Sequence, residues 1–421
     1  MVARWVVVLC MLGACGDNIQ PWTATPCHVT GEFSEVGLQD FASDGNLAFI
    51  GDNNLYVASP GCDGQTVLVA PNIAHAWFCG PALLAFPNPY TPDTSPALIA
   101  WNRAYGPMTV AMNVDPTATH CSPDGRHFST EANDVLDDGT PTVNLMVFDT
   151  STLVAHWTYQ LDRPRARFTH DSTSVLIASA PYTGAPYSLS RLTLADGRLN
   201  LIGPIEHSRF EISKDDQYVV FTRLPSLVRM SLASGTEQVL ADDLTSVPGR
   251  DELVADDDLV AYIGGGTLRI VPLTGGPPKT LATASTLVAH LPGLIFYVGP
   301  DGFSAVTTAG AKRVFKNGLI EDSTSERVLI AGGSQRFVID LPSFAAHSLA
   351  GNYPQAALTR DDRIVALEPD TSIKFVTGYH DVVLPATRGA PFILDRDRRE
   401  LAAVEYATTG TTVRVVRVQL P

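Results

Sequence analysis

The sequence predicts an all-β fold, a single β-propeller of four-stranded antiparallel blades. A polar turn followed by an almost continuously apolar strand recurs along the chain, as in ISKDDQYVVFTR at residues 212–223. A second strand, often alternating apolar and polar side chains, follows after a short loop, and no stretch after the N-terminal segment has the spacing of an amphipathic helix. Because a sheet that is apolar on both faces must be covered on both sides, a ring of such sheets is the expected solution.

The N-terminal segment is expected to be a targeting signal that is cleaved from the chain. Residues 1–4 are a short basic start, and residues 5–12 are an apolar run too brief to cross a bilayer. The stretch LGAC, which ends at Cys15, resembles the lipobox of bacterial lipoproteins. This resemblance implies that residues 1–14 are a signal peptide and that Cys15 becomes the acylated N-terminus. An ordinary secretory signal or a buried N-terminal strand is the alternative.

Residues 15–30 are then expected to form a lipidated flexible stem, because they contain polar residues and two prolines. The propeller domain is expected over residues 31–421. No later apolar stretch approaches about 20 residues, so only the lipid would touch the membrane. The expected location is the bacterial cell envelope, with the outer membrane favoured and the body facing the periplasm or the cell surface.

Four cysteines remain for the mature body: Cys27, Cys62, Cys79 and Cys121. An even number in an oxidising compartment favours two disulfides, with three pairings open. Free buried thiols are the alternative, and metal binding is disfavoured because no C-x-x-C spacing occurs.

The composition limits the classes of partner. Apolar residues make up 45% of the chain and charged residues 17%, so a large core is expected. The formal net charge of −15 opposes binding to nucleic acid. We expect a monomer that binds envelope proteins or glycans and carries no cofactor.

The recurring turns give the approximate number of blades. Further copies begin near residues 41, 121, 168, 254, 358 and 394. Short polar side chains such as Asp, Ser and Gly suit tight hairpin turns. The repeat length of about 35 to 45 residues fits one four-stranded blade, and about eight blades are favoured, with seven to ten open. The last unit, residues 390–420, is expected to take a strand from residues 28–40 to close the ring.

The turns of residues 122–125 and 213–216, Ser-Pro-Asp-Gly and Ser-Lys-Asp-Asp, look like the PD40 or TolB-type repeat of WD40-like propellers. The resemblance covers most of the chain beyond about residue 35. It implies the propeller fold.

No sequence motif points to catalysis. H-E-x-x-H, G-x-S-x-G, phosphate-binding and dinucleotide-binding patterns are absent, so no catalytic or metal-ligating residue is assigned. Arg163, Arg165 and Arg167 are clustered and could receive a carboxylate ligand, although a solvated loop between blades is the simpler interpretation. Four histidines, His120, His127, His170 and His207, lie near turns and could gather at the channel, or they could be ordinary loop residues.

Aromatic residues crowd one irregular unit, residues 71–112. A binding rim could be formed by Trp77, Phe78, Tyr90, Trp101 and Tyr105. The favoured alternative is an aromatic plug that fills an untidy blade.

The leading hypothesis is therefore a non-catalytic, lipid-anchored scaffold that binds protein or glycan. The alternative is a propeller enzyme, a hydrolase or lyase, whose polar groups converge at the mouth of the channel. Several Asp, Glu, His or Arg side chains converging in one pocket would favour the enzyme.

Overall fold

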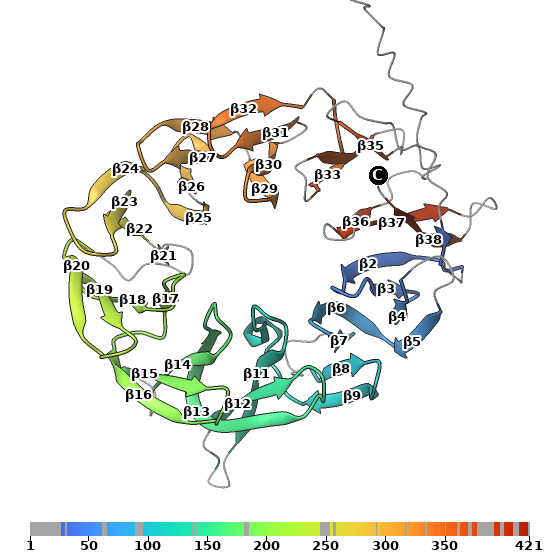
Figure 1. Cartoon of the computed structure of the whole chain (residues 1–421), viewed down its shortest axis with the longest axis horizontal. Coiled ribbons are helices and arrows are strands. Elements are labelled where there is room, and N and C mark those ends of the chain that lie inside the picture. The colour runs from blue at the N-terminus through green and yellow to red at the C-terminus, as the bar shows by residue number, and fades with distance from the viewer. Residues whose placement is uncertain are drawn as a thin grey trace, which may run out of the picture.

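The computed structural model describes residues 27–29, 32–60, 65–88, 96–135, 139, 141–180, 185–244, 253–255, 258–291, 293–315, 318–332, 335–349, 351–359, 363–368, 373–376, 391–395, 400–406 and 412–419. The expected signal peptide, Cys15 and most of the stem lie outside these ranges, as do Cys62 and Tyr90. Antiparallel sheets follow one another around a common axis, which confirms the all-β propeller (Figure 1).

The strands are grouped here into blades, numbered in chain order. Blade 1 contains β2 (Val36–Phe41), β3 (Leu47–Gly51), β4 (Asn54–Ala58) and β5 (Thr66–Ala70). Blade 2 contains β6 (Ile73–Cys79), β7 (Ala82–Pro87), β8 (Leu98–Asn102) and β9 (Gly106–Ala111). Blade 3 contains β10 (His120–Cys121), β11 (His127–Val135), β12 (Pro141–Asp149) and the first half of β13 (Ala155–Phe168). A single turn of 3₁₀ helix, η1 (Pro116–Ala118), precedes β10.

The next three blades follow the same plan. Blade 4 contains the second half of β13 with β14 (Ser174–Ala180), β15 (Tyr187–Thr193) and β16 (Leu199–Ile205). Blade 5 contains β17 (Phe210–Ile212), β18 (Tyr218–Arg223), β19 (Ser226–Ser231) and β20 (Glu237–Ala241). Blade 6 contains β21 (Leu253–Ala255), β22 (Leu259–Gly264), β23 (Thr267–Pro272) and β24 (Lys279–Thr283).

The last blades complete the ring. Blade 7 contains β25 (Thr286–Leu291), β26 (Leu294–Gly299), β27 (Gly302–Thr307) and β28 (Lys312–Phe315). Blade 8 contains β29 (Gly318–Ser323), β30 (Arg327–Gly332), β31 (Gln335–Asp340) and β32 (Ala345–Ser348). Blade 9 contains β33 (Gln355–Leu358), β34 (Ile364–Leu367) and β35 (Ile373–Phe375), and blade 10 contains β36 (Phe392–Asp395), β37 (Glu400–Tyr406), β38 (Val413–Gln419) and β1 (Cys27–His28).

The favoured number of eight blades is not confirmed. The described strands form nine hydrogen-bonded sheets, and the seven-stranded one contains two blades because β13 runs through both. The described residues therefore group into ten units, the upper end of the expected range. No α-helix occurs in the described ranges, and none contains a helix able to cross a bilayer.

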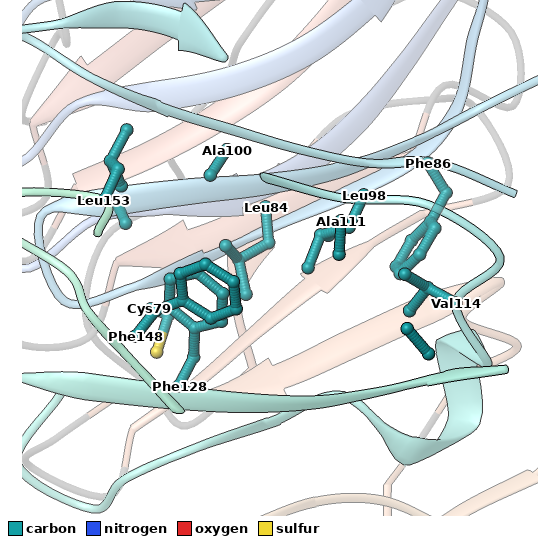
Figure 2. Packing of buried hydrophobic residues seen from close by; sticks show 12 residues of the cluster. Cys79, Leu84, Phe86, Leu98, Ala100, Ala111, Val114, Phe128, Phe148 and Leu153 are labelled. Atoms are coloured by element: carbon teal, nitrogen blue, oxygen red, sulfur yellow. The ribbon is translucent and has the colours of Figure 1, made fainter. Parts of the chain in front are cut away.

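Hydrophobic cores lie between blades. The ten core clusters of the described residues each combine two blades that are neighbours around the ring. In the core between blades 2 and 3, the rings of Phe128 and Phe148 stack with centroids 4.7 Å apart, close to Cys79 and Leu84 (Figure 2). Each continuously apolar strand is thus covered on both faces, as its sequence requires.

The chain ends meet in blade 10. β1 pairs with β38, where Cys27 lies opposite Arg417, and Phe33 bridges to Val413. The described residues that complete the blade are thus 27–29 and Phe33, which begin one position before the range of 28–40 expected from the sequence and use only its first part. The difference arises because Val36–Phe41 already forms a hairpin with β3 in blade 1.

Candidate functional site

The recurring turn is a hydrogen-bonded unit. Ser213 Oγ lies 2.6 Å from Asp215 Oδ1 and accepts the Tyr218 amide at 2.9 Å. Asp215 Oδ1 also accepts the Gln217 amide at 3.0 Å. The same contacts recur for Ser122 with Asp124 and for Thr169 with Asp171. The Ser/Thr-x-Asp pattern therefore recurs because it satisfies the backbone of a tight turn.

The fourth residue of each turn has a left-handed backbone. Gly45, Gly125, Ser172 and Asp216 have φ values of 84°, 68°, 58° and 55°. Gly adopts this conformation without a steric penalty, and short polar residues tolerate it. The variation at this position from Gly to Ser and Asp follows from that requirement.

The turn carboxylates are anionic acceptors. Partial burial raises the pKa of Asp171, but hydrogen bonds from Thr169 and Thr173 outweigh it and hold the pKa below the ordinary value. The same balance, with Ser122 and Arg126 as donors, lowers the pKa of Asp124. Their stabilisation is present at neutral pH and is lost as the pH falls through these lowered values.

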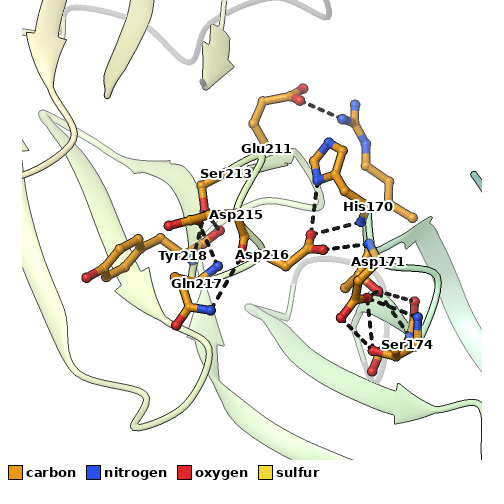
Figure 3. A network of polar contacts seen from close by, with 12 residues as sticks. His170, Asp171, Ser174, Glu211, Ser213, Asp215, Asp216, Gln217 and Tyr218 are labelled. Atoms are coloured by element: carbon orange, nitrogen blue, oxygen red, sulfur yellow. Dashed lines mark hydrogen bonds and ion pairs between the residues drawn. The ribbon is translucent and has the colours of Figure 1, made fainter. Parts of the chain in front are cut away.

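Neighbouring turns are also joined to one another. Asp216 in blade 5 accepts the His170 amide at 2.9 Å and the Asp171 amide at 2.8 Å, both from blade 4, and its Oδ1 lies 3.0 Å from His170 Nδ1 (Figure 3). Ser172 Oγ accepts the Asp124 amide of blade 3 at 3.1 Å. The turns thus link consecutive blades as well as strands.

A polar groove lies between blades 4 and 5 at these turns. One part has a volume of about 460 Å³ and is lined by His170, Asp171, Arg191, Lys214, Asp215, Asp216, Gln217, Leu232 and Ala233. A second part of about 410 Å³ is lined by Arg191, Thr193, Asn200, Leu201, Ile202, Leu232, Ala233, Ser234 and Gly235. Because both parts include Arg191, Leu232 and Ala233, they adjoin. This groove is the candidate functional site.

The sequence analysis did not assign this groove. It noted His170 and the two turns, but Arg191 lies in β15 and Asn200 in β16, in strands that carry no motif. Several charged side chains do converge in this one groove, which is the observation that the sequence analysis took as favouring an enzyme. The groove lies between two blades, whereas the enzyme hypothesis placed the pocket at the mouth of the channel.

Polar side chains of the inner strands form hydrogen bonds between neighbouring blades. The side chains of one inner strand accept backbone amides of the next blade: Asp40 accepts Phe78 at 2.8 Å, and Asp322 accepts Leu358 at 2.7 Å. Gln355 similarly accepts the Phe392 amide at 2.9 Å. Inner strands have an edge without a neighbouring strand, so these side chains satisfy amides that would otherwise lack partners.

The arginine cluster lies in the second half of β13, which is the inner strand of blade 4. Arg167 donates to Glu211 of blade 5 at 2.6 Å. Burial raises the pKa of Glu211, and Arg167 and Arg165 partly counter that effect. The side chain of Arg163 lies outside the described residues. Arg167 thus forms an ion pair between blades, and the cluster does not lie in a solvated loop.

Burial similarly affects Glu131 of β11. It raises the pKa of this carboxyl to about 7, helped by the nearby carboxylate of Asp115. Arg165 and the amide of Ala166 act in the opposite direction.

The aromatic residues do not share one exposed surface. Trp101 is 7% exposed, and Trp77 and Phe78 pack partly buried against two different cores. Tyr105 is 57% exposed. Trp77, Phe78 and Trp101 are therefore packed in the interior, as an aromatic plug would be. Of the four described residues, only Tyr105 is exposed, as a binding rim would require.

Three of the four cysteines lie in described strands, and two of them are joined to each other. Cys79 and Cys121 form a disulfide between blades 2 and 3, with Cα atoms 5.6 Å apart. Cys27 lies in β1 beside β38. In the part of the chain that the structure describes, no three His, Cys, Asp or Glu residues form a group able to hold a metal ion.

Comparison with known proteins bears on the fold alone. No protein-family model matches the chain, and no curated protein matches it. A solved structure of a eukaryotic initiation factor is 12% identical, with a TM-score of 0.50 over 86% of this chain and 89% of that one.

Two further solved structures are more distant. The β-propeller domain of the Trilobed protease from Pyrococcus furiosus is 10% identical, with a TM-score of 0.38 over 69% of this chain and 96% of that one. TolB from Acinetobacter baumannii is 17% identical, with a TM-score of 0.28 over 60% of this chain and 67% of that one.

Proposed function

We propose that this chain is a lipid-anchored protein of the bacterial cell envelope whose propeller is a non-catalytic binding scaffold for envelope proteins or glycans. The observation that carries the proposal is that polar side chains of the inner strands and turns form hydrogen bonds with the protein's own backbone. Inner-strand carboxylates and amides bind the backbone of the next blade, and turn carboxylates bind the backbone of their own turn. Groups held in this way stiffen a surface, and a preorganised surface loses little entropy when it binds.

The anchor is tested with Cys15→Ser. The acylated cysteine would hold the chain on a membrane, with the outer membrane favoured, so the variant should leave the membrane fraction for the soluble periplasmic fraction. Cys10→Ser, in the expected signal peptide but outside the lipobox, is the matched control and should remain bound. Unchanged membrane association of Cys15→Ser would refute acylation at that residue.

The scaffold is tested by direct binding. The purified protein is immobilised and offered solubilised envelope proteins and, separately, purified envelope glycans. Saturable binding of one class is expected. Failure to bind either class would contradict the proposal.

One observation favours the enzyme alternative, a hydrolase or lyase. His170 Nδ1 lies 3.0 Å from Asp216 Oδ1 beside the groove, and a carboxylate in this position can orient an imidazole for proton transfer. Peptide, ester and uronate-polymer substrates would be screened with native protein and His170→Gln. Turnover that falls roughly 100-fold or more in the variant would establish catalysis and displace the scaffold as the main function.

A further inference from the structure

We propose that the perimeter of blades 1 and 2 lies on the membrane that holds the lipid anchor, through exposed apolar side chains of β5 and of the segment around β9. The inference rests on the lipid anchor proposed above and gives the protein a second membrane contact. The sequence analysis expected the lipid alone to touch the membrane.

The chain enters the fold at the perimeter of the ring. The strands of blade 10 follow the order β1-β38-β37-β36, and β36 lies nearest the centre of the ring, so β1 is the outermost strand (Figure 1). About twelve residues, from Cys15 onwards, precede Cys27 of β1. A stretch of that length spans at most about 40 Å. An acylated Cys15 would therefore keep the perimeter of blade 10 close to the bilayer.

Blade 1 continues the perimeter beside this entry point. Its outermost strand is β5, in which Leu68 lies opposite Tyr56 of β4. Side chains that lie opposite each other in a strand pair share one face of the sheet. Because Tyr56 packs against the core between blades 10 and 1, Leu68 lies on the face of blade 1 that is turned towards blade 10.

An apolar strip covers this part of the perimeter. Strand β9, the outermost of blade 2, lies beside β5. The strip consists of five side chains that are 41% to 60% exposed: Val67 and Leu68 in β5, Tyr105 before β9, Met108 in β9 and Met112 after it. Neither strand contains a charged residue. Exposed apolar residues beside a tyrosine are typical of surfaces that contact the membrane interface.

Other outer strands of the ring are charged. Blades 5, 6 and 7 have Glu237 in β20, Lys279 in β24, and Lys312 and Arg313 in β28. Charges on an edge strand oppose contact with apolar surfaces. Strand β16 of blade 4 is also uncharged, but its exposed Leu201 lines the groove between blades 4 and 5. The apolar strip is thus next to the place where the chain enters the fold.

The lipid surface is the occupant that these observations favour. The formal net charge of −15 opposes both a second copy of the chain and an anionic membrane. A short tether raises the effective concentration of whatever lies at its far end, and the far end here would be acyl chains in a bilayer. The strip therefore meets zwitterionic headgroups, and the ring stands on its edge with both flat faces open to partners.

The test measures the oxidation of methionines on and off a membrane. Native lipidated protein in phosphatidylcholine vesicles is compared with soluble Cys15→Ser protein, with hydrogen peroxide as oxidant and mass spectrometry as readout. Met108 and Met112 should oxidise at least about fivefold more slowly on vesicles. Buried Met230 is the internal reference and should react equally in both. The new methionine of V314M, on β28 across the ring, should not be protected (Figure 1).

Paired variants test the strip itself. V67Q/L68Q keeps the net charge and removes two apolar side chains, so Met108 on vesicles should oxidise within about twofold of its rate in solution. Circular dichroism and melting temperature check that the fold persists. V239Q/V314Q removes two exposed valines from β20 and β28 and should leave Met108 protected.

Three outcomes would overturn this inference alone: equal oxidation of Met108 on vesicles and in solution, full protection in V67Q/L68Q, or equal protection of the new methionine in V314M. Slow oxidation of Met108 in soluble protein that rises on dilution would assign the strip to a second copy. Retention of Cys15→Ser in the membrane fraction would refute the anchor and this inference together. Unprotected Met108 in protein that floats with the vesicles would refute the strip and leave the anchor intact.

Discussion

At the scale of single residues, the hydroxyl of each recurring turn has the most constrained role. Ser213 and Thr169 are 0% exposed, and Ser122 is 3% exposed. Each lies between the turn carboxylate and the first amide of the following strand. A buried hydroxyl with both contacts is costly to remove, because its partners then lack hydrogen bonds.

We expect Ser213→Ala to lower the free energy of unfolding by roughly 1–3 kcal/mol, because it leaves the Tyr218 amide unsatisfied. Ser234→Ala, at an exposed hydroxyl, should change it by less than about 0.5 kcal/mol. Urea denaturation followed by fluorescence measures both. Equal effects would show that the buried hydroxyl has no special role.

The cysteines give a second residue-scale prediction. With Cys79 joined to Cys121, the two disulfides that the sequence analysis expects would pair Cys27 with Cys62. Peptide mapping without reduction should therefore recover both linkages and no mixed pair. The double variant Cys79→Ala/Cys121→Ala should lower the free energy of unfolding by about 2–4 kcal/mol. A Cys27–Cys79 peptide would contradict the assignment.

At the scale of single elements, β-bulges explain how the inner strands reach the next blade. Consecutive side chains of a regular strand point to opposite faces. In β2 the register shifts between Leu38 and Asp40, and Gln39 and Asp40 both accept amides of β6. In β29 it shifts between Ile320 and Asp322, and Glu321 and Asp322 both accept amides of β33. The extra residue lets two successive side chains serve the same neighbour.

Glu131 should make folding stability depend on pH. Its pKa in the folded protein, about 7, lies above the ordinary value, so the folded state favours the protonated carboxyl. The resulting stabilisation is full below about pH 4.5 and is lost as the pH rises through about 7. Glu131→Gln keeps an acceptor for the Ala166 amide and cannot ionise. At pH 8 it should be more stable than the native protein by roughly 1–3 kcal/mol, and at pH 4.5 nearly equal.

Denaturant midpoints between pH 4.5 and pH 8.5 test this expectation. Glu35→Gln, at an exposed carboxyl, is the control and should follow the native profile. A constant difference between Glu131→Gln and the native protein across this range would refute the role of Glu131.

At the scale of the whole molecule, a buried cation links the two blades at which the ring closes. Arg417 is 2% exposed, pairs with Glu400, and donates to the carbonyls of Ser59 at 2.6 Å and Gly45 at 2.7 Å. Ser59 and Gly45 flank strands of blade 1, whereas Arg417 and Glu400 lie in blade 10. One side chain thus joins the last blade to the first. The two blades are neighbours in the ring (Figure 1).

We expect Arg417→Met to lower the free energy of unfolding by about 3–5 kcal/mol, because Glu400 would remain buried without its partner. Arg414→Met removes an exposed partner of Glu32 from the same strand and should cost at most about 1 kcal/mol. Thermal and chemical denaturation compare the two. Similar losses in both variants would show that closure does not depend on the buried pair.

The sequence alone determined the features that depend on near neighbours. A turn with its hydroxyl and carboxylate spans six residues, and the apolar or alternating pattern of a strand spans about as many, so both can be read from a short window. The class of fold follows from them, since two-sided apolar sheets must be stacked. The sequence also contains no C-x-x-C spacing, which is why the cysteines were expected to form disulfides and not to bind a metal ion.

Only the tertiary structure decided features that join distant parts of the chain. The number of blades depended on β13 passing through two sheets, and the groove depended on residues of two blades, such as Arg191 and Lys214, lining one cavity. Asp40 and Asp322 read as ordinary polar residues until their partners in the next blade are known. The reason is physical: these contacts are set by how blades stack, and no short stretch of sequence contains both partners.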